Sequence, residues 1–113
     1  MIALAGRKSL ADKLLEGLTG PDPHDRSYLL LYDFRGTRAG TRFYTNLQRI
    51  MEKAGDSASL VQLSAFTTTS LKAAIAAQAL ASGMDAETAV YEARERTADE
   101  LRARLKEAQS EEP

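Results

Sequence analysis

An apolar run, Tyr28-Leu29-Leu30-Leu31-Tyr32-Asp33-Phe34, lies between two segments rich in turn-forming residues. Its length and its aliphatic and aromatic content are typical of a strand that is buried on both faces, in the middle of a sheet covered by helices. Such a strand requires further strands and helices from the same chain. The 113 residues are enough for one core of this kind and too few for two ordinary domains.

The composition limits the classes of function. With 43% hydrophobic and 27% charged residues, the chain is typical of a globular protein. It has no apolar run near the roughly eighteen residues of a membrane span and no signal-peptide pattern, so we expect a cytoplasmic protein. The absence of cysteine and the single histidine exclude disulfides, thiol catalysis and the usual zinc sites. A net charge of −1 confines any nucleic-acid contact to a local patch.

A helix is predicted over residues 8–18, with Ser9 as its cap and leucines at helical spacing. The proline-rich segment Thr19–Pro23 ends it and makes a rigid connector. This helix is therefore expected to pack on the domain as an appendage or to reach a partner. The predicted organisation is a helix and linker over residues 1–23, an α/β domain over 24–110 and a tail over 111–113.

Further elements follow the apolar strand. The sequence predicts a helix that Thr41 caps, a single strand from Ala58 to Thr67, an alanine-rich helix from Leu71 to Ser82, and a charged helix from Arg96 to Gln109.

The segment Asp85–Arg94 fits either a third strand or the start of a long C-terminal helix. We favour the strand, because two strands alone make too thin a sheet. Short connections between successive strands and helices predict parallel pairing through right-handed crossovers. The predicted fold class is α/β (α+β), with a βαβαβ core and a helix at each end.

Asp33 is the main candidate site residue, because a carboxylate at the end of an apolar strand lies where α/β sites are often found. Such a carboxylate can bind Mg²⁺ together with water and phosphate oxygens. The commoner role is structural. In that case Asp33 would accept hydrogen bonds from the loop amides of Gly36 and Thr37, or pair with Arg35 or Arg38.

Arginines are concentrated just after Asp33, at positions Arg35, Arg38, Arg42 and Arg49. Guanidinium groups match the geometry of phosphate, and neighbouring glycines allow a backbone to approach closely. The commoner origin of such a cluster is the solvated face of an amphipathic helix. Adjacency to Asp33 favours the alternative, in which the arginines bind nucleic acid.

The segment from Tyr28 to Thr67 resembles Cas2-type proteins of CRISPR systems. The resemblance is carried by Leu30-Leu31-Tyr32-Asp33-Phe34, by Arg38, Arg42, Phe43, Leu47 and Ile50, and by Val61-Gln62-Leu63-Ser64-Ala65-Phe66. It implies a ferredoxin-like βαββαβ fold, a homodimer, association with nucleic acid, and a metal-binding role for Asp33. The N-terminal helix and the long C-terminal helix are departures from the family pattern.

Two hypotheses for function follow. In the first, a Cas2-like homodimer binds nucleic acid through Arg35, Arg38, Arg42 and Arg49, and Asp33 of each subunit holds Mg²⁺ for phosphodiester hydrolysis. In the second, the chain is a non-catalytic assembly module whose terminal helices bind a protein partner. The first is the leading hypothesis, and the second is the alternative that the near-neutral net charge and the lack of further metal ligands favour.

Overall fold

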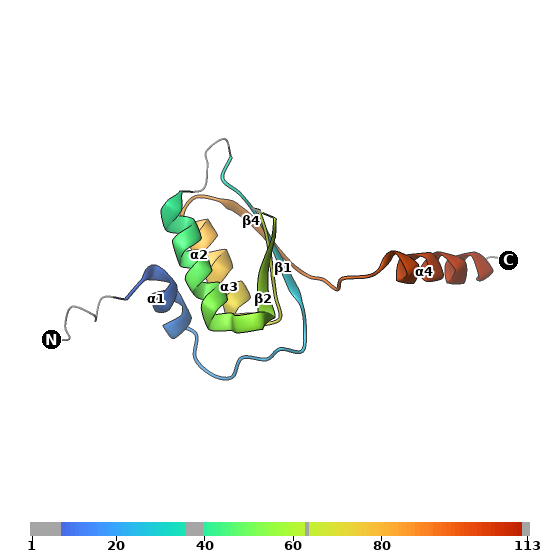
Figure 1. The fold of residues 1–113 in the computed structure, drawn as a ribbon, viewed down its shortest axis with the longest axis horizontal. Helices are drawn as coiled ribbons and strands as arrows, with labels where there is room; N and C mark the ends of the chain where they lie inside the picture. Colours follow the sequence, from blue (N-terminus) through green and yellow to red (C-terminus); the bar gives the residue numbers. More distant parts are fainter. Residues whose placement is uncertain (1–7, 36–39, 63, 112–113) are drawn as a thin grey trace.

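The computed structural model describes residues 8–35, 40–62 and 64–111 (Figure 1). The elements in chain order are α1 (Leu10–Glu16), β1 (Tyr28–Asp33), α2 (Thr41–Ala54), the 3-10 turn η2 (Gly55–Ser57), β2 (Ala58–Gln62), β3 (Ala65–Thr68), α3 (Leu71–Gly83), β4 (Glu87–Glu92) and α4 (Ala98–Ser110).

The four strands form one antiparallel sheet in the order β2-β3-β1-β4. The predicted parallel pairing and βαβαβ core are therefore wrong. The single strand predicted from Ala58 to Thr67 is two strands, which form a hairpin with an irregularity between Leu60 and Gln62. The reversal places β3 antiparallel to β1, and the backbone N–H of Tyr32 donates to the carbonyl of Ser64 over 3.2 Å. The described elements from β1 to β4 thus run βαββαβ.

Local sequence signals account for most of the element boundaries. Ser9 caps α1 by accepting a hydrogen bond from the N–H of Asp12, which confirms its prediction, and Ser70 caps α3 in the same way through the N–H of Ala73. The favoured strand in the segment Asp85–Arg94 is confirmed as β4. The predicted cap at Thr41 is wrong, because the extended residue before α2 is Gly40 and Thr41 is already helical.

Helices α1, α2 and α3 cover one face of the sheet (Figure 1). The core between them contains the inward side chains of the central strands and both longer helices, chiefly Leu30, Tyr32, Phe43, Leu47, Ile50, Phe66 and Leu80. Helix α1 belongs to this layer, because Ala11 is fully buried and its N–H donates to the side-chain oxygen of Asn46 over 2.9 Å. Of the two roles expected for the N-terminal helix, packing on the domain is the one observed.

The other face of the sheet is open. Leu29 and Leu31 alternate with the buried Leu30 and Tyr32 and therefore lie on this second face. The strand register adds Ala65, Thr67, Ala89 and Tyr91 to it. Leu31 is 41% exposed and Tyr91 54%, so the prediction that β1 is buried on both faces is wrong. We call the surface formed by Leu29, Leu31, Ala65, Thr67, Ala89 and Tyr91 the open sheet face.

Helix α4 stands away from the domain, beyond an extended segment at residues 93–97 (Figure 1). Every residue from Ala98 to Ser110 is exposed. The radius of gyration is 17.7 Å, whereas a compact chain of this length has about 13 Å. Among the described residues, no helix combines the length and apolar character that crossing a membrane requires.

Candidate functional site

Asp33 ends β1 at one edge of the open sheet face, and its partner on β4 is Glu87. Both carboxylates are exposed and lie on the same face of the sheet. The guanidinium of Arg35 binds the Glu87 carboxylate, so that one cation accompanies the two acids. Residues from β1, β4 and the β2–β3 turn line a shallow depression of about 520 Å³ around this pair.

The backbone at this edge is fixed by Asp33 itself. Its Oδ1 accepts a hydrogen bond from the N–H of Arg35 over 2.9 Å, and Arg35 has a φ of 47°. A side-chain acceptor two residues upstream stabilises such a turn. Asp33 therefore does have a structural role of the kind predicted. Gly36, Thr37 and Arg38, the other expected partners, lie outside the described residues.

The predicted arginine cluster is divided between two layers of the molecule. Arg35 lies beside the open sheet face, whereas Arg42 and Arg49 lie on α2, which covers the opposite face. The guanidinium of Arg49 contacts Asp12 of α1 over 3.3 Å and Glu52 over 3.6 Å. Arg49 thus helps to hold α1 against α2. Arg42 is exposed in the first turn of α2.

The Asp33–Glu87 pair can be compared with the ligands that Mg²⁺ prefers. Mg²⁺ takes oxygen ligands and is often held by one or two carboxylates plus substrate phosphates. Here one of the two carboxylates already binds the Arg35 cation. Within the described ranges, no group of three or more acidic, histidine or cysteine side chains could hold a metal ion. In one copy, Asp33 is therefore the carboxylate of this pair that has no cation partner in the described part of the chain.

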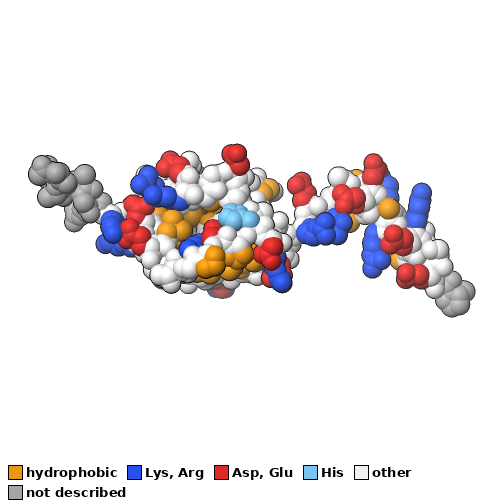
Figure 2. Space-filling view, turned by 90° about the horizontal axis from the view of Figure 1, so that it is seen from below, with side chains coloured by type: hydrophobic (Ala, Val, Ile, Leu, Met, Phe, Trp, Pro, Cys, Tyr) orange, Lys and Arg blue, Asp and Glu red, His pale blue; other side chains and the backbone are white. Residues whose placement is uncertain are grey.

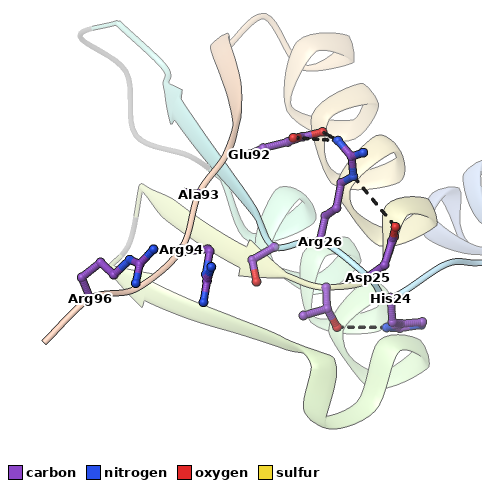
Figure 3. A pocket seen from close by; sticks show the side chains of 9 residues that line it. His24, Asp25, Arg26, Glu92, Ala93, Arg94 and Arg96 are labelled. Atoms are coloured by element: carbon purple, nitrogen blue, oxygen red, sulfur yellow. Dashed lines mark hydrogen bonds and ion pairs between the residues drawn. The ribbon is translucent and has the colours of Figure 1, made fainter. Parts of the chain in front are cut away.

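A second concave surface lies at the opposite end of the sheet, where the chain enters β1 and leaves β4 (Figure 3). Its volume is about 770 Å³. The basic side chains that line it are His24 and Arg26, from the segment before β1, and Arg94 and Arg96, from the segment after β4. We call this surface the arginine pocket.

Acidic residues neutralise the arginine pocket only in part. Arg26 binds Glu92 over 2.9 Å and lies 3.9 Å from Asp25, and Arg96 binds Glu100 over 3.0 Å. No carboxylate in the described part of the chain is paired with Arg94, which Figure 3 shows directed into the pocket. Since these ion pairs are exposed, a phosphate group can compete for both arginines.

Sequence reasoning missed the arginine pocket because its residues come from three separate segments. Only the antiparallel pairing of β1 with β4 brings Arg26 beside Glu92. The imidazole of His24 is fixed by Thr69 over 2.9 Å and lies 3.4 Å from Asp22. The available signal was the pair of basic residues after β4, Arg94 and Arg96. Arg94 ended a segment whose secondary structure was ambiguous, and Arg96 was predicted to begin the C-terminal helix, which starts at Ala98 instead.

Comparisons of the chain with protein-family models, with curated proteins and with solved structures found no match.

Proposed function

We propose that this chain is a homodimeric assembly protein that binds a second copy through its open sheet face. The observation that carries the proposal is the exposure of Leu31 on the inner strand β1 and of Tyr91 on the neighbouring strand β4, both on the open sheet face. Neighbouring exposed apolar side chains on one face of a domain are typical of an interaction site. An antiparallel sheet with helices on one face can leave its other face to solvent when that face is polar, so the apolar side chains on the open sheet face are what indicate a partner.

The strand arrangement supports a ferredoxin-like fold as part of this proposal. The βαββαβ order of the elements and the sheet order β2-β3-β1-β4 are those of the ferredoxin-like motif. The resemblance of residues 28–67 to Cas2-type proteins implies the same fold and a homodimer.

The experiment that tests the proposal compares two matched substitutions. Leu31 lies on the open sheet face and is 41% exposed, whereas Ile75 lies on α3 and is 43% exposed. Leu31→Glu places a charge in the proposed interface and should yield a monomer in size-exclusion chromatography with light scattering. Ile75→Glu should remain a dimer. Equal masses for the two variants would contradict the proposal, provided that circular dichroism shows both folded.

Nucleic-acid binding is a second candidate function, and the arginine pocket favours it. Arg26, Arg94 and Arg96 line one concave surface, and guanidinium groups suit phosphate. Arg42 and Arg49, which the sequence predicted to bind nucleic acid, lie on α2 and do not line this pocket. In this candidate function, the residues of the arginine pocket bind the phosphates instead.

A salt series with a labelled oligonucleotide tests this second candidate. Phosphate contact predicts that the association constant falls steeply as salt rises. Arg94→Gln should weaken binding and reduce the salt slope by about one unit, as expected for the loss of one phosphate contact. Arg42→Gln is the matched control and should leave both quantities unchanged. Absence of binding at low salt, or an equal effect of the two variants, would reject the arginine pocket as the contact.

A further inference from the structure

Helix α4 has an apolar stripe that contacts nothing in the described chain. Ala98, Leu101, Leu105 and Ala108 are spaced three, four and three residues apart, so they lie along one side of the helix. Leu101 and Leu105 are 59% and 60% exposed. Figure 2 shows the helix apart from the domain, with acidic and basic side chains over much of its surface.

The sequence nevertheless specifies this helix firmly. Thr97 and Glu100 form a capping box, in which the N–H of Glu100 donates to Thr97 Oγ1 over 3.1 Å and the N–H of Thr97 donates to Glu100 Oε1 over 3.3 Å. An isolated helix of 13 residues is only marginally stable in water. Packing of its apolar side against another surface is therefore expected to supply the rest of its stability.

The open sheet face matches this stripe in length and spacing. Helix α4 and strand β1 are each about 20 Å long. Leu101 and Leu105 are about 6 Å apart along the helix axis, and Leu29 and Leu31 are about 7 Å apart along the strand. Two leucines of the helix can thus pack beside two leucines of the strand.

The charges beside the two surfaces are complementary. Arg102 and Arg104 flank the leucines of α4, one on each side. The open sheet face ends at Asp33 and Glu87, whose two negative charges exceed the one positive charge of Arg35 beside them. Both arginines are highly exposed, and their ion pairs within the helix are 3.2 Å and 3.4 Å long. Exposed pairs of this kind contribute little, so exchange for new carboxylate partners costs little.

The connection to α4 directs the helix away from its own sheet. The N–H of Ala93 donates to the carbonyl of Ser27 over 2.9 Å, which continues the pairing of β4 with the chain before β1. Residues 93–97 then remain extended and contain neither glycine nor proline, the residues that most readily reverse a chain. A return of α4 onto its own sheet would need a reversal in this segment.

We propose that α4 of each copy covers the open sheet face of a second copy, so that two chains exchange their C-terminal helices. This inference rests on the proposed homodimer and names the element that completes its interface. When the exchange is reciprocal, so that the copy that receives a helix returns its own to the same partner, the assembly closes at a dimer. The apolar stripe of α4 and the open sheet face are then buried together.

Cysteine cross-linking tests the exchange cleanly, because the chain has no cysteine of its own. Leu31→Cys and Leu105→Cys are made in the full chain, unfolded together, refolded as a mixture and oxidised. The exchange predicts a disulfide-linked dimer in this mixture and none in either variant alone. A mixture of Ile75→Cys with Leu105→Cys is the matched control and should give no cross-link.

Other outcomes overturn the exchange and identify what replaces it. Cross-linking of Leu31→Cys alone would show that two sheets pack face to face, and cross-linking of Leu105→Cys alone would show that two α4 helices pair. A chain carrying both cysteines that forms only an internal disulfide would show that α4 folds back. A dimer that forms no mixed cross-link would overturn the exchange and leave the homodimer standing, whereas a monomer would overturn both. As a second readout, Leu105→Ala should weaken the dimer by about tenfold or more.

Discussion

Asp33 and Glu87 lie opposite one another on β1 and β4, and Arg35 binds Glu87 from the turn that Asp33 stabilises. Two carboxylates placed directly across a strand pair repel each other unless a cation lies nearby. Arg35 is therefore expected to reduce the repulsion between Asp33 and Glu87 and so to stabilise this end of the sheet.

Replacement of Arg35 should expose this repulsion. Arg35→Ala removes the cation beside Glu87, so we expect a small loss of stability, below about 1 kcal/mol as is usual for surface charge pairs. Urea unfolding measures it. The double variant Arg35→Ala with Glu87→Gln should recover part of the loss, because the repulsion with Asp33 is gone. No recovery in the double variant would show that Arg35 acts through some other contact.

Asn46 should be important for the attachment of α1. Its side chain is buried, accepts from the N–H of Ala11 and donates to the carbonyl of Arg42, each over 2.9 Å. Asn46→Leu leaves the buried N–H of Ala11 without a partner, which should cost about 1–3 kcal/mol. Chemical unfolding and proteolysis near residue 20 are the measurements. Gln48→Ala, an exposed change on the same helix, should have little effect, and equal losses for the two variants would refute this role.

The stability should fall in acid partly through Asp22. Burial acts to raise the pKa of Asp22, but hydrogen bonds from the Lys72 N–H and the Ser70 hydroxyl, together with the charge of His24, outweigh it and lower the pKa below 3.8. A lowered pKa in the folded state gives stability that is present above the unfolded value and lost as the pH falls through the folded value. Unfolding between about pH 5 and pH 2 measures this loss. Asp22→Asn should flatten the dependence, and an unchanged curve would contradict the assignment.

We expect Asp33 to stabilise the turn after β1 and not to serve in the cleavage of nucleic acid. Because Arg35 already binds the Glu87 carboxylate and its N–H donates to Asp33 Oδ1, both acids have competing partners, and we expect no Mg²⁺-dependent hydrolysis of RNA or DNA by the wild type. Asp33→Asn, which keeps a side-chain oxygen for the turn, should give the same result. Cleavage by the wild type that Asp33→Asn abolishes would instead support the nuclease predicted from the Cas2 resemblance.

The sequence is sufficient to predict elements whose signals are local. Ser9 and Ser70 mark the starts of their helices by hydrogen bonds to residues three positions away. The split of residues 58–67 into β2 and β3 has no such signal, because that stretch contains no glycine, proline or asparagine. The turn there follows from the pairing of β3 with β1, which is a long-range contact.

The candidate site could be predicted only in part for the same reason. Asp33 and Arg35 are close in the sequence and do interact. Glu87 and the arginine pocket depend on the register of β1 with β4, which no local pattern specifies. The leucine-rich pattern of β1 suggested cover on both faces. In the described part of the chain, helices cover only one face of the sheet. We propose that α4 of a second copy covers the other.

Sedimentation equilibrium of the wild-type chain tests the central claim, the homodimer, most directly. The account predicts a mass of twice 12.3 kDa at high concentration, with dissociation to 12.3 kDa on dilution. A mass of 12.3 kDa at every concentration would contradict it.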